Sequence, residues 1–120
     1  LGLVGSEMCI RDRGNLKQER FIIVILDNKH RFLSETTVTV GLLNRSLVHP
    51  REVFAEAIEQ RAAAIICIHN HPSGDSSPSE EDKRITRRLQ ESGELLGIPL
   101  LDHIIISKED FTSFADEGWL

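Results

Sequence analysis

Apolar residues in this 120-residue chain gather in short runs that are separated by polar segments. The runs richest in isoleucine and valine are too short for long helices and are typical of buried strands. Elsewhere, apolar residues recur at helical spacing. The pattern predicts strands at 21–26, 31–40, 62–68, 100–106 and 111–114, and helices at 50–61 and 78–96.

The order of these elements indicates the fold class. Asp27-Asn28-Lys29 is a turn signal, so the first two strands are expected to form a β-hairpin. The helix–strand units that follow suggest helices flanking a mixed β-sheet, which is an α/β or α+β arrangement. A chain of this length buries a single core, so we expect one domain.

The strand predicted at 62–68 runs into His69-Asn70-His71-Pro72. Because side chains alternate along a strand, His69 and His71 share a face and can both reach one ion. Pro72 cannot donate to a sheet ladder, so the strand is expected to end there. Paired imidazoles at a strand end predict a metal site.

A helix-start signal follows at Ser77-Pro78-Ser79-Glu80, with proline at the first helical position and a Ser-x-x-Glu capping box. Ser79 and Asp82 are three residues apart at this start and therefore share a helix face. The Asp82 carboxylate would join His69 and His71 in a cup of three ligands. Such a cup leaves a fourth position for water, as catalytic zinc sites do.

Three other residues near the cup are possible ligands. Asp75 rivals Asp82, but a loop carboxylate is held less precisely than one in a helical first turn. Cys67 shares the face of the histidines, but a buried cysteine is usually a small core residue, and we predict that role. His49 opens the first predicted helix and is interpreted as structural.

Asp102 and His103 are neighbours on a predicted strand. Their side chains therefore point to opposite faces and cannot form a same-face dyad. We predict that His103 is a structural residue near the sheet, with a role in supporting the metal site left open.

Composition narrows the function classes. The chain is 40% apolar and 28% charged with a net charge of −5, which argues against a strong non-specific nucleic-acid binder. The basic residues at 83–88 lie close to glutamates, so they predict a charge-paired helix face. No apolar run approaches a membrane span. Cys9 and Cys67 form no disulfide framework, so a reducing, cytoplasmic setting is expected.

The motif His-x-His-Pro, six further residues and Ser-x-x-Asp resembles the JAMM (MPN+) metalloprotease signature, carried here by His69, His71, Ser79 and Asp82. The segment HNHPSGD and the later LDHIII most resemble bacterial RadC-like JAB domains. The resemblance extends from about Asn15 to the C-terminus. It implies a cytidine-deaminase-like three-layer domain with a mixed sheet flanked by helices.

The resemblance also implies roles for individual residues. One zinc ion per chain would be held by His69, His71 and Asp82, and Ser79 would help to hold the water or the tetrahedral intermediate. An upstream glutamate would act as general acid/base. By its surroundings alone Glu35 is an exposed strand residue, but the family pattern places the catalytic glutamate after the hairpin turn, so Glu35 takes this role.

We therefore expect residues 14–120 to form a RadC-like JAB/MPN domain. Residues 1–13 resemble translated adapter sequence and are expected to be a non-native lead-in. RadC-like proteins usually carry a helical N-terminal region with a helix-hairpin-helix, so the chain is expected to be a C-terminal fragment.

Two functions remain open from the sequence. The first is a zinc-dependent hydrolase of amide or isopeptide bonds in a protein or peptide substrate, without direct nucleic-acid binding. The second is a non-enzymatic accessory or protein-interaction domain associated with DNA repair. Deamination is disfavoured because the chain lacks a Pro-Cys-x-x-Cys pair.

Overall fold

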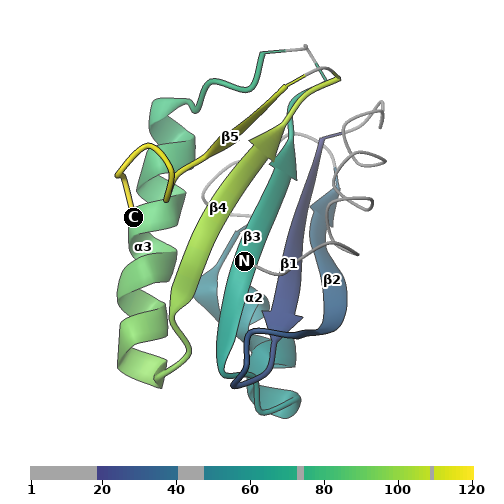
Figure 1. The fold of residues 1–120 in the computed structure, drawn as a ribbon, viewed down its shortest axis with the longest axis vertical. Coiled ribbons are helices and arrows are strands. Elements are labelled where there is room, and N and C mark those ends of the chain that lie inside the picture. The colour runs from purple at the N-terminus through teal and green to yellow at the C-terminus, as the bar shows by residue number, and fades with distance from the viewer. Residues whose placement is uncertain (1–18, 41–47, 73–74, 109) are drawn as a thin grey trace.

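The structure is a computed structural model that describes residues 19–40, 48–72, 75–108 and 110–120. A mixed sheet forms its centre, with strand order β2-β1-β3-β4-β5 (Figure 1). Only β3 and β4 pair in parallel; the other neighbours are antiparallel. The elements are β1 (Arg20–Leu26), β2 (Phe32–Val40), α2 (Pro50–Glu59), β3 (Ala64–Asn70), α3 (Glu80–Leu96), β4 (Leu100–Ile106) and β5 (Phe111–Ser113).

The predicted fold class, an α+β domain with a mixed sheet, is confirmed. The hairpin of β1 and β2 and the strand at 100–106 occur as expected. The strand predicted at 62–68 is instead Ala64–Asn70, because Arg61 and Ala63 belong to the turn that precedes it. Residues 1–13 and Cys9 lie outside the described residues.

The start of α3 differs from its prediction. Ser79 is the N-cap: its Oγ accepts a hydrogen bond from the Asp82 N–H at 3.1 Å, and an Asp82 oxygen accepts from the Ser79 N–H at 2.8 Å. The capping box predicted for Ser77 and Glu80 is therefore wrong, and the helix begins two residues later than expected. The aspartate side chain reaches back to the cap residue in the role that glutamate fills in the usual box.

Alternating strand residues bury two apolar clusters, one on each face of the sheet. On β1, Phe21, Ile23 and Ile25 belong to the cluster that packs against the helices, and the residues between them belong to the other. Both described helices contribute to the first cluster, through Phe54 of α2 and Ile85 of α3 among others. Burying each large apolar side chain here contributes about 1.5–3 kcal/mol to the free energy of folding, relative to leaving it exposed.

The strand directions bring distant residues together at one end of the sheet. His69 of β3 pairs with Phe21 of antiparallel β1 and with Ile105 of parallel β4. The beginning of β1 and the ends of β3 and β4 therefore meet, and α3 begins a short loop after β3 (Figure 1). Within the described residues, no helix is long and apolar enough to cross a membrane.

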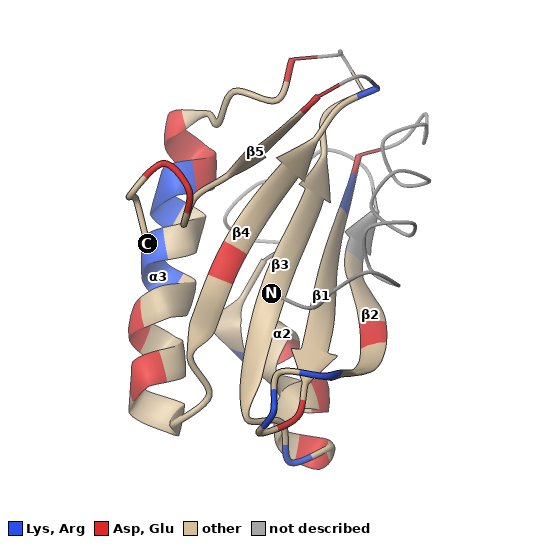
Figure 2. Cartoon of the chain, viewed as in Figure 1, with Lys and Arg blue, Asp and Glu red and all other residues tan. Residues whose placement is uncertain are grey.

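Acidic residues occupy both ends of α3, and the basic residues lie between them (Figure 2). Lys83 lies 3.8 Å from Glu80 and Arg84 lies 3.6 Å from Glu81, each pair three residues apart. Pairs of this kind on an exposed helix face support the helix modestly. The first turns of α3 thus carry the charge-paired face that the sequence predicted.

At Gly93, α3 packs closely against the segment that follows the helix. A Cβ at Gly93 would lie 2.5 Å from the Ile98 carbonyl oxygen and 3.3 Å from the Phe54 ring. Alanine is more favourable than glycine in a helix by about 1 kcal/mol. The Ile98 carbonyl oxygen, however, can move away from an added Cβ only if the end of the helix shifts. We expect Gly93→Ala to lower the free energy of unfolding by roughly 1–3 kcal/mol, measured by urea denaturation.

The control for this substitution is Glu91→Ala, at an exposed position of the same helix. It should change the free energy of unfolding by no more than about 0.5 kcal/mol. A Gly93→Ala variant as stable as the parent would show that α3 does not rest on the segment after it.

Candidate metal centre

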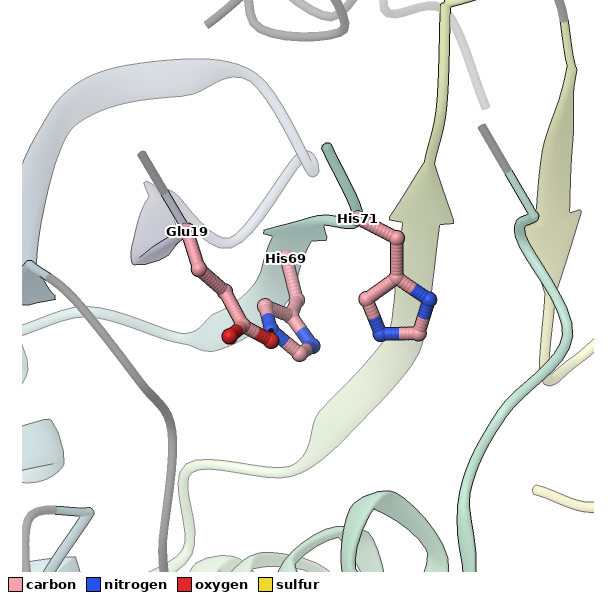
Figure 3. A group of neighbouring side chains, drawn as sticks. All are labelled: Glu19, His69 and His71. Carbon is pink, nitrogen blue, oxygen red and sulfur yellow. Dashed lines mark hydrogen bonds and ion pairs between the residues drawn. The ribbon is translucent and has the colours of Figure 1, made fainter. Parts of the chain in front are cut away.

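The two histidines that end β3 lie side by side. The ring centroids of His69 and His71 are 4.7 Å apart, with the ring planes nearly perpendicular. His69 is buried and His71 is partly exposed. In the view of Figure 3, the His69 ring lies between the Glu19 carboxylate and the His71 ring. The structure thus brings together the pair of imidazoles that the sequence singled out.

Asp82 reaches both rings from the first turn of α3. Its Oδ1 lies 3.4 Å from Nδ1 of His69, and its Oδ2 lies 3.4 Å from Nε2 of His71. Burial would raise the pKa of Asp82, but its contacts with His69 and His71 and the Ser79 N–H outweigh burial and lower it. The carboxylate is therefore ionised and held by the cap of its own helix.

The His71 ring is oriented by the loop that follows it. Its Nδ1 lies 2.9 Å from the carbonyl oxygen of Asp75, which can only accept, so Nδ1 donates. The other nitrogen then faces Asp82, and the neutral ring presents Nε2 as a possible ligand. The contact with Asp82 raises the pKa of His71, and the Asp75 carbonyl adds to the effect.

Glu19 is a site residue that the sequence interpretation missed. Its Oε1 lies 2.5 Å from Nε2 of His69. Glu19, His69 and His71 offer three ligand atoms that lie within 4.8 Å of one another (Figure 3). The available signal was position: Glu19 directly precedes β1, whose beginning lies beside the end of β3.

Glu35 lies elsewhere. Glu35 pairs with Val24 of β1, and Val24 pairs in turn with Ile66 of β3. Val24 and Ile66 belong to the apolar cluster on the face of the sheet away from the helices. The neighbouring Ser34 donates to Gln60 at the end of α2, so Glu35 points to the opposite side. Ile66 is three residues, or about 10 Å, from His69 along the strand. The structure does not bring Glu35 to the histidines.

The other residues weighed as ligands have structural contacts. Cys67 is a buried free thiol whose pKa is raised by burial, as predicted for a core residue. His49 is the N-cap of α2, and its Nδ1 accepts from the Arg51 N–H at 3.0 Å. The exposed Asp75 carboxylate accepts from the Ser77 N–H at 2.9 Å.

His103 and Asp102 point to opposite faces, as expected. Asp102 accepts hydrogen bonds from the Ser113 hydroxyl and the Ala115 N–H. His103 is fully buried, with its ring centroid 6.2 Å from that of His69 and its Nδ1 2.5 Å from Oγ1 of Thr86. Burial lowers the pKa of His103 to about 3, so the imidazole is neutral near pH 7.

The donor set fits a zinc ion. Zinc binds imidazole nitrogen and carboxylate oxygen, and one Asp82 oxygen lies 3.4 Å from Nδ1 of His69 while the other lies 3.4 Å from Nε2 of His71. Nδ1 of His69 is buried without a hydrogen-bond partner among the described residues, as suits an atom that receives a cation. Glu19 lies too close to His69 to share the ion in this arrangement and fits better as the hydrogen-bond partner of that ring.

The metal-free centre makes a prediction about pH. In protein stripped with a chelator, the pKa of His71 should exceed the ordinary value of about 6.5, and Asp82→Asn should lower it, because Asp82 is the principal cause of the shift. Two-dimensional NMR titration of the imidazole resonances measures both. Asp75→Asn is the matched control and should leave most of the shift, since the Asp75 contact comes from its backbone carbonyl.

The same ion pair should make the stability of the metal-free protein depend on pH. Because the pKa of His71 is raised, its pairing stabilises the folded protein fully at pH values below about 6.5. Because the pKa of Asp82 is lowered, its pairing stabilises the folded protein fully at pH values above about 3.9. The contribution should therefore be largest between these values and decline as the pH rises through the His71 pKa. Urea denaturation across this range should show a flatter profile for Asp82→Asn, and an unchanged profile would contradict the pairing.

Comparisons with known proteins identify the family of this chain. Residues 5–119 match the family model of the RadC-like JAB domain. The UPF0758 protein of Bacillus licheniformis is 55% identical over 105 residues, which cover 88% of this chain and 47% of that relative. The UPF0758 protein YsxA of Bacillus subtilis is 48% identical over 116 residues, which cover 97% of this chain and 50% of that relative.

A UPF0758 protein of Methanospirillum hungatei is 53% identical over 111 residues, which cover 92% of this chain and 49% of that relative. The chain spans about half the length of the curated relatives that it matches. The family match over nearly the whole chain shows that it belongs to the RadC-like JAB domain family.

Proposed function

We propose that this domain is a zinc-dependent hydrolase of amide or isopeptide bonds in a protein or peptide substrate. The observation that carries the proposal is the Asp82 carboxylate, which has one oxygen 3.4 Å from Nδ1 of His69 and the other 3.4 Å from Nε2 of His71. One zinc ion per chain would be held by His69, His71 and Asp82. When bound, zinc would supply a Lewis acid and lower the pKa of its water toward neutrality.

Glu19 supplies the general acid/base in this proposal, in the role that the sequence assigned to Glu35. One of its carboxylate oxygens lies within 4.8 Å of a nitrogen of each histidine. It would take the proton of the attacking water and return it to the leaving nitrogen. Glu35, on the opposite face of the sheet, is retained only as the alternative that the experiment below distinguishes.

Ser79 would stabilise the negative charge that develops on the substrate carbonyl oxygen. Its Oγ already accepts a hydrogen bond from the Asp82 N–H, which leaves the hydroxyl hydrogen free to donate. Ser79 is exposed at the beginning of α3, beside the carboxylate of Asp82. A donor in that place would strengthen its bond as the oxyanion forms.

The proposal includes the cellular setting and partners. A domain with a net charge of −5 and a charge-paired α3 is a poor non-specific nucleic-acid binder, so the substrate is taken to be a protein or peptide. The buried, unpaired Cys67 fits a reducing cytoplasm.

Zinc content tests the ligand set. Purified protein should hold about one zinc ion per chain by elemental analysis, because His69, His71 and Asp82 would supply three ligands to one ion. His71→Ala and Asp82→Asn should lose the metal, whereas Glu19→Gln should retain it. If Asp82→Asn retained zinc and Glu19→Gln lost it, Glu19 would be the zinc ligand and Asp82 the candidate base. Folded parent protein without zinc, even after reconstitution, would refute the centre.

Hydrolysis tests the assignment of the base. The zinc-loaded protein should cleave quenched fluorogenic peptide mixtures or isopeptide-linked lysine peptides. Glu19→Gln should slow cleavage by about 10²–10⁴-fold with zinc retained. Glu35→Gln, the same chemical change on the other face of the sheet, should have little effect. The reverse result would support Glu35, and no cleavage by zinc-loaded parent protein would favour an accessory domain.

A further inference from the structure

His103 of β4 is a buried imidazole that the proposed chemistry does not use. Its exposed fraction is 0%. The ring stacks on Phe114 with 4.7 Å between centroids, and Phe21 meets it edge-on at 5.6 Å. An apolar ring would occupy this aromatic site without the cost of burying ring nitrogens. The surroundings alone therefore do not account for a histidine here.

The hydrogen bonds around Thr86 determine which nitrogen of His103 carries the proton. Oγ1 of Thr86 lies 2.7 Å from the carbonyl oxygen of Asp82, which can only accept, so the hydroxyl donates its one hydrogen there. Nδ1 of His103 lies 2.5 Å from the same Oγ1. Because the hydroxyl hydrogen is committed, Nδ1 must be the donor in this second bond.

The other ring nitrogen has no such role. Nε2 of His103 is buried without a hydrogen-bond partner among the described residues. In the tautomer that carries hydrogen on Nδ1, Nε2 is an unpaired acceptor, which costs folding free energy. The one contribution of this imidazole that phenylalanine could not make is the N–H directed at Thr86.

Thr86 connects that N–H to a residue of the metal centre. It lies one helical turn after Asp82 and bonds to the carbonyl of Asp82 itself. The capping box with Ser79 holds the same turn from its other side. His103 also lies close to the histidine at the end of β3, with 6.2 Å between its ring centroid and that of His69. The first turn of α3 is thus tied to β4, the strand next to β3.

We propose that His103 is a positioning residue for the metal centre: through Thr86 it holds the Asp82 turn of α3 against the sheet, at the separation at which Asp82 meets both histidines. The inference rests on the proposed function, since zinc is the ion for which that separation matters. His103 itself does not touch the ion in this role. Its effect is on the affinity for metal.

Replacing His103 by asparagine or by glutamine shows which of its two ring nitrogens matters. The amide nitrogen of asparagine can replace Nδ1, and that of glutamine can replace Nε2. His103→Gln and Thr86→Val should weaken zinc binding by about 10–100-fold, the usual effect of losing a group that supports a ligand. His103→Asn and Thr86→Ser, which keep the donor and the hydroxyl, should stay close to the parent protein. Competition with a chromophoric zinc chelator measures each affinity.

The same experiment distinguishes positioning from a purely structural role. Urea denaturation of the metal-free variants reports their folding, and equal zinc affinity in folded parent, His103→Gln and Thr86→Val proteins would overturn the inference. Retained affinity in His103→Gln with loss in His103→Asn would overturn it too, because Nε2 would then be the working atom. If the parent protein binds no zinc, the proposed function fails and this inference fails with it. Parent binding with unaffected variants refutes the inference alone.

A measurement that needs no substitution and no metal completes the test. Long-range ¹H–¹⁵N NMR of the metal-free parent protein assigns the tautomer of each histidine. His103 should carry its hydrogen on Nδ1, as the Thr86 bonds require. A hydrogen on Nε2 would overturn the proposal even if the variants failed to fold.

Discussion

The pairing of β3 between antiparallel β1 and parallel β4 is the constraint on which the rest of the structure depends. It buries β3 on both faces and sets its carboxyl end beside the beginning of β1 and the end of β4. Every described group of the candidate centre is attached to one of these three strand ends or to the helix that follows β3. The candidate centre is therefore attached to a fully buried strand, and such rigid elements hold side chains more precisely than loops do.

Asp82 serves two purposes with one carboxylate. It completes the capping box that begins α3, and it faces a nitrogen of each histidine. A buried carboxylate is costly unless it is paired and hydrogen-bonded, and Asp82 has both kinds of partner. This pairing raises the pKa of His71. The start of α3 and the protonation of His71 are thus coupled through a single side chain.

Much of the centre could be predicted because its residues are close in sequence. His69 and His71 follow from strand alternation, and Asp82 follows from a helix start one short loop later. The general position of α3 was predictable too, but its first residue was not. Ser77 and Ser79 both offer caps, and only the contacts of Asp82 with its neighbours select Ser79. The hydrophobic runs likewise predicted the sheet, since their burial needs no knowledge of partners.

Local pattern by itself determined the class of fold, the pair of imidazoles and the acidic turn that faces them, because each depends on residues within a few positions of one another. Tertiary structure alone decided which glutamate joins the centre. Glu19 directly precedes the hairpin and Glu35 lies within it, but strand register places Glu19 beside the end of β3 and turns Glu35 to the opposite face. Register depends on hydrogen bonds between strands distant in sequence, and a shift of one residue exchanges the two faces.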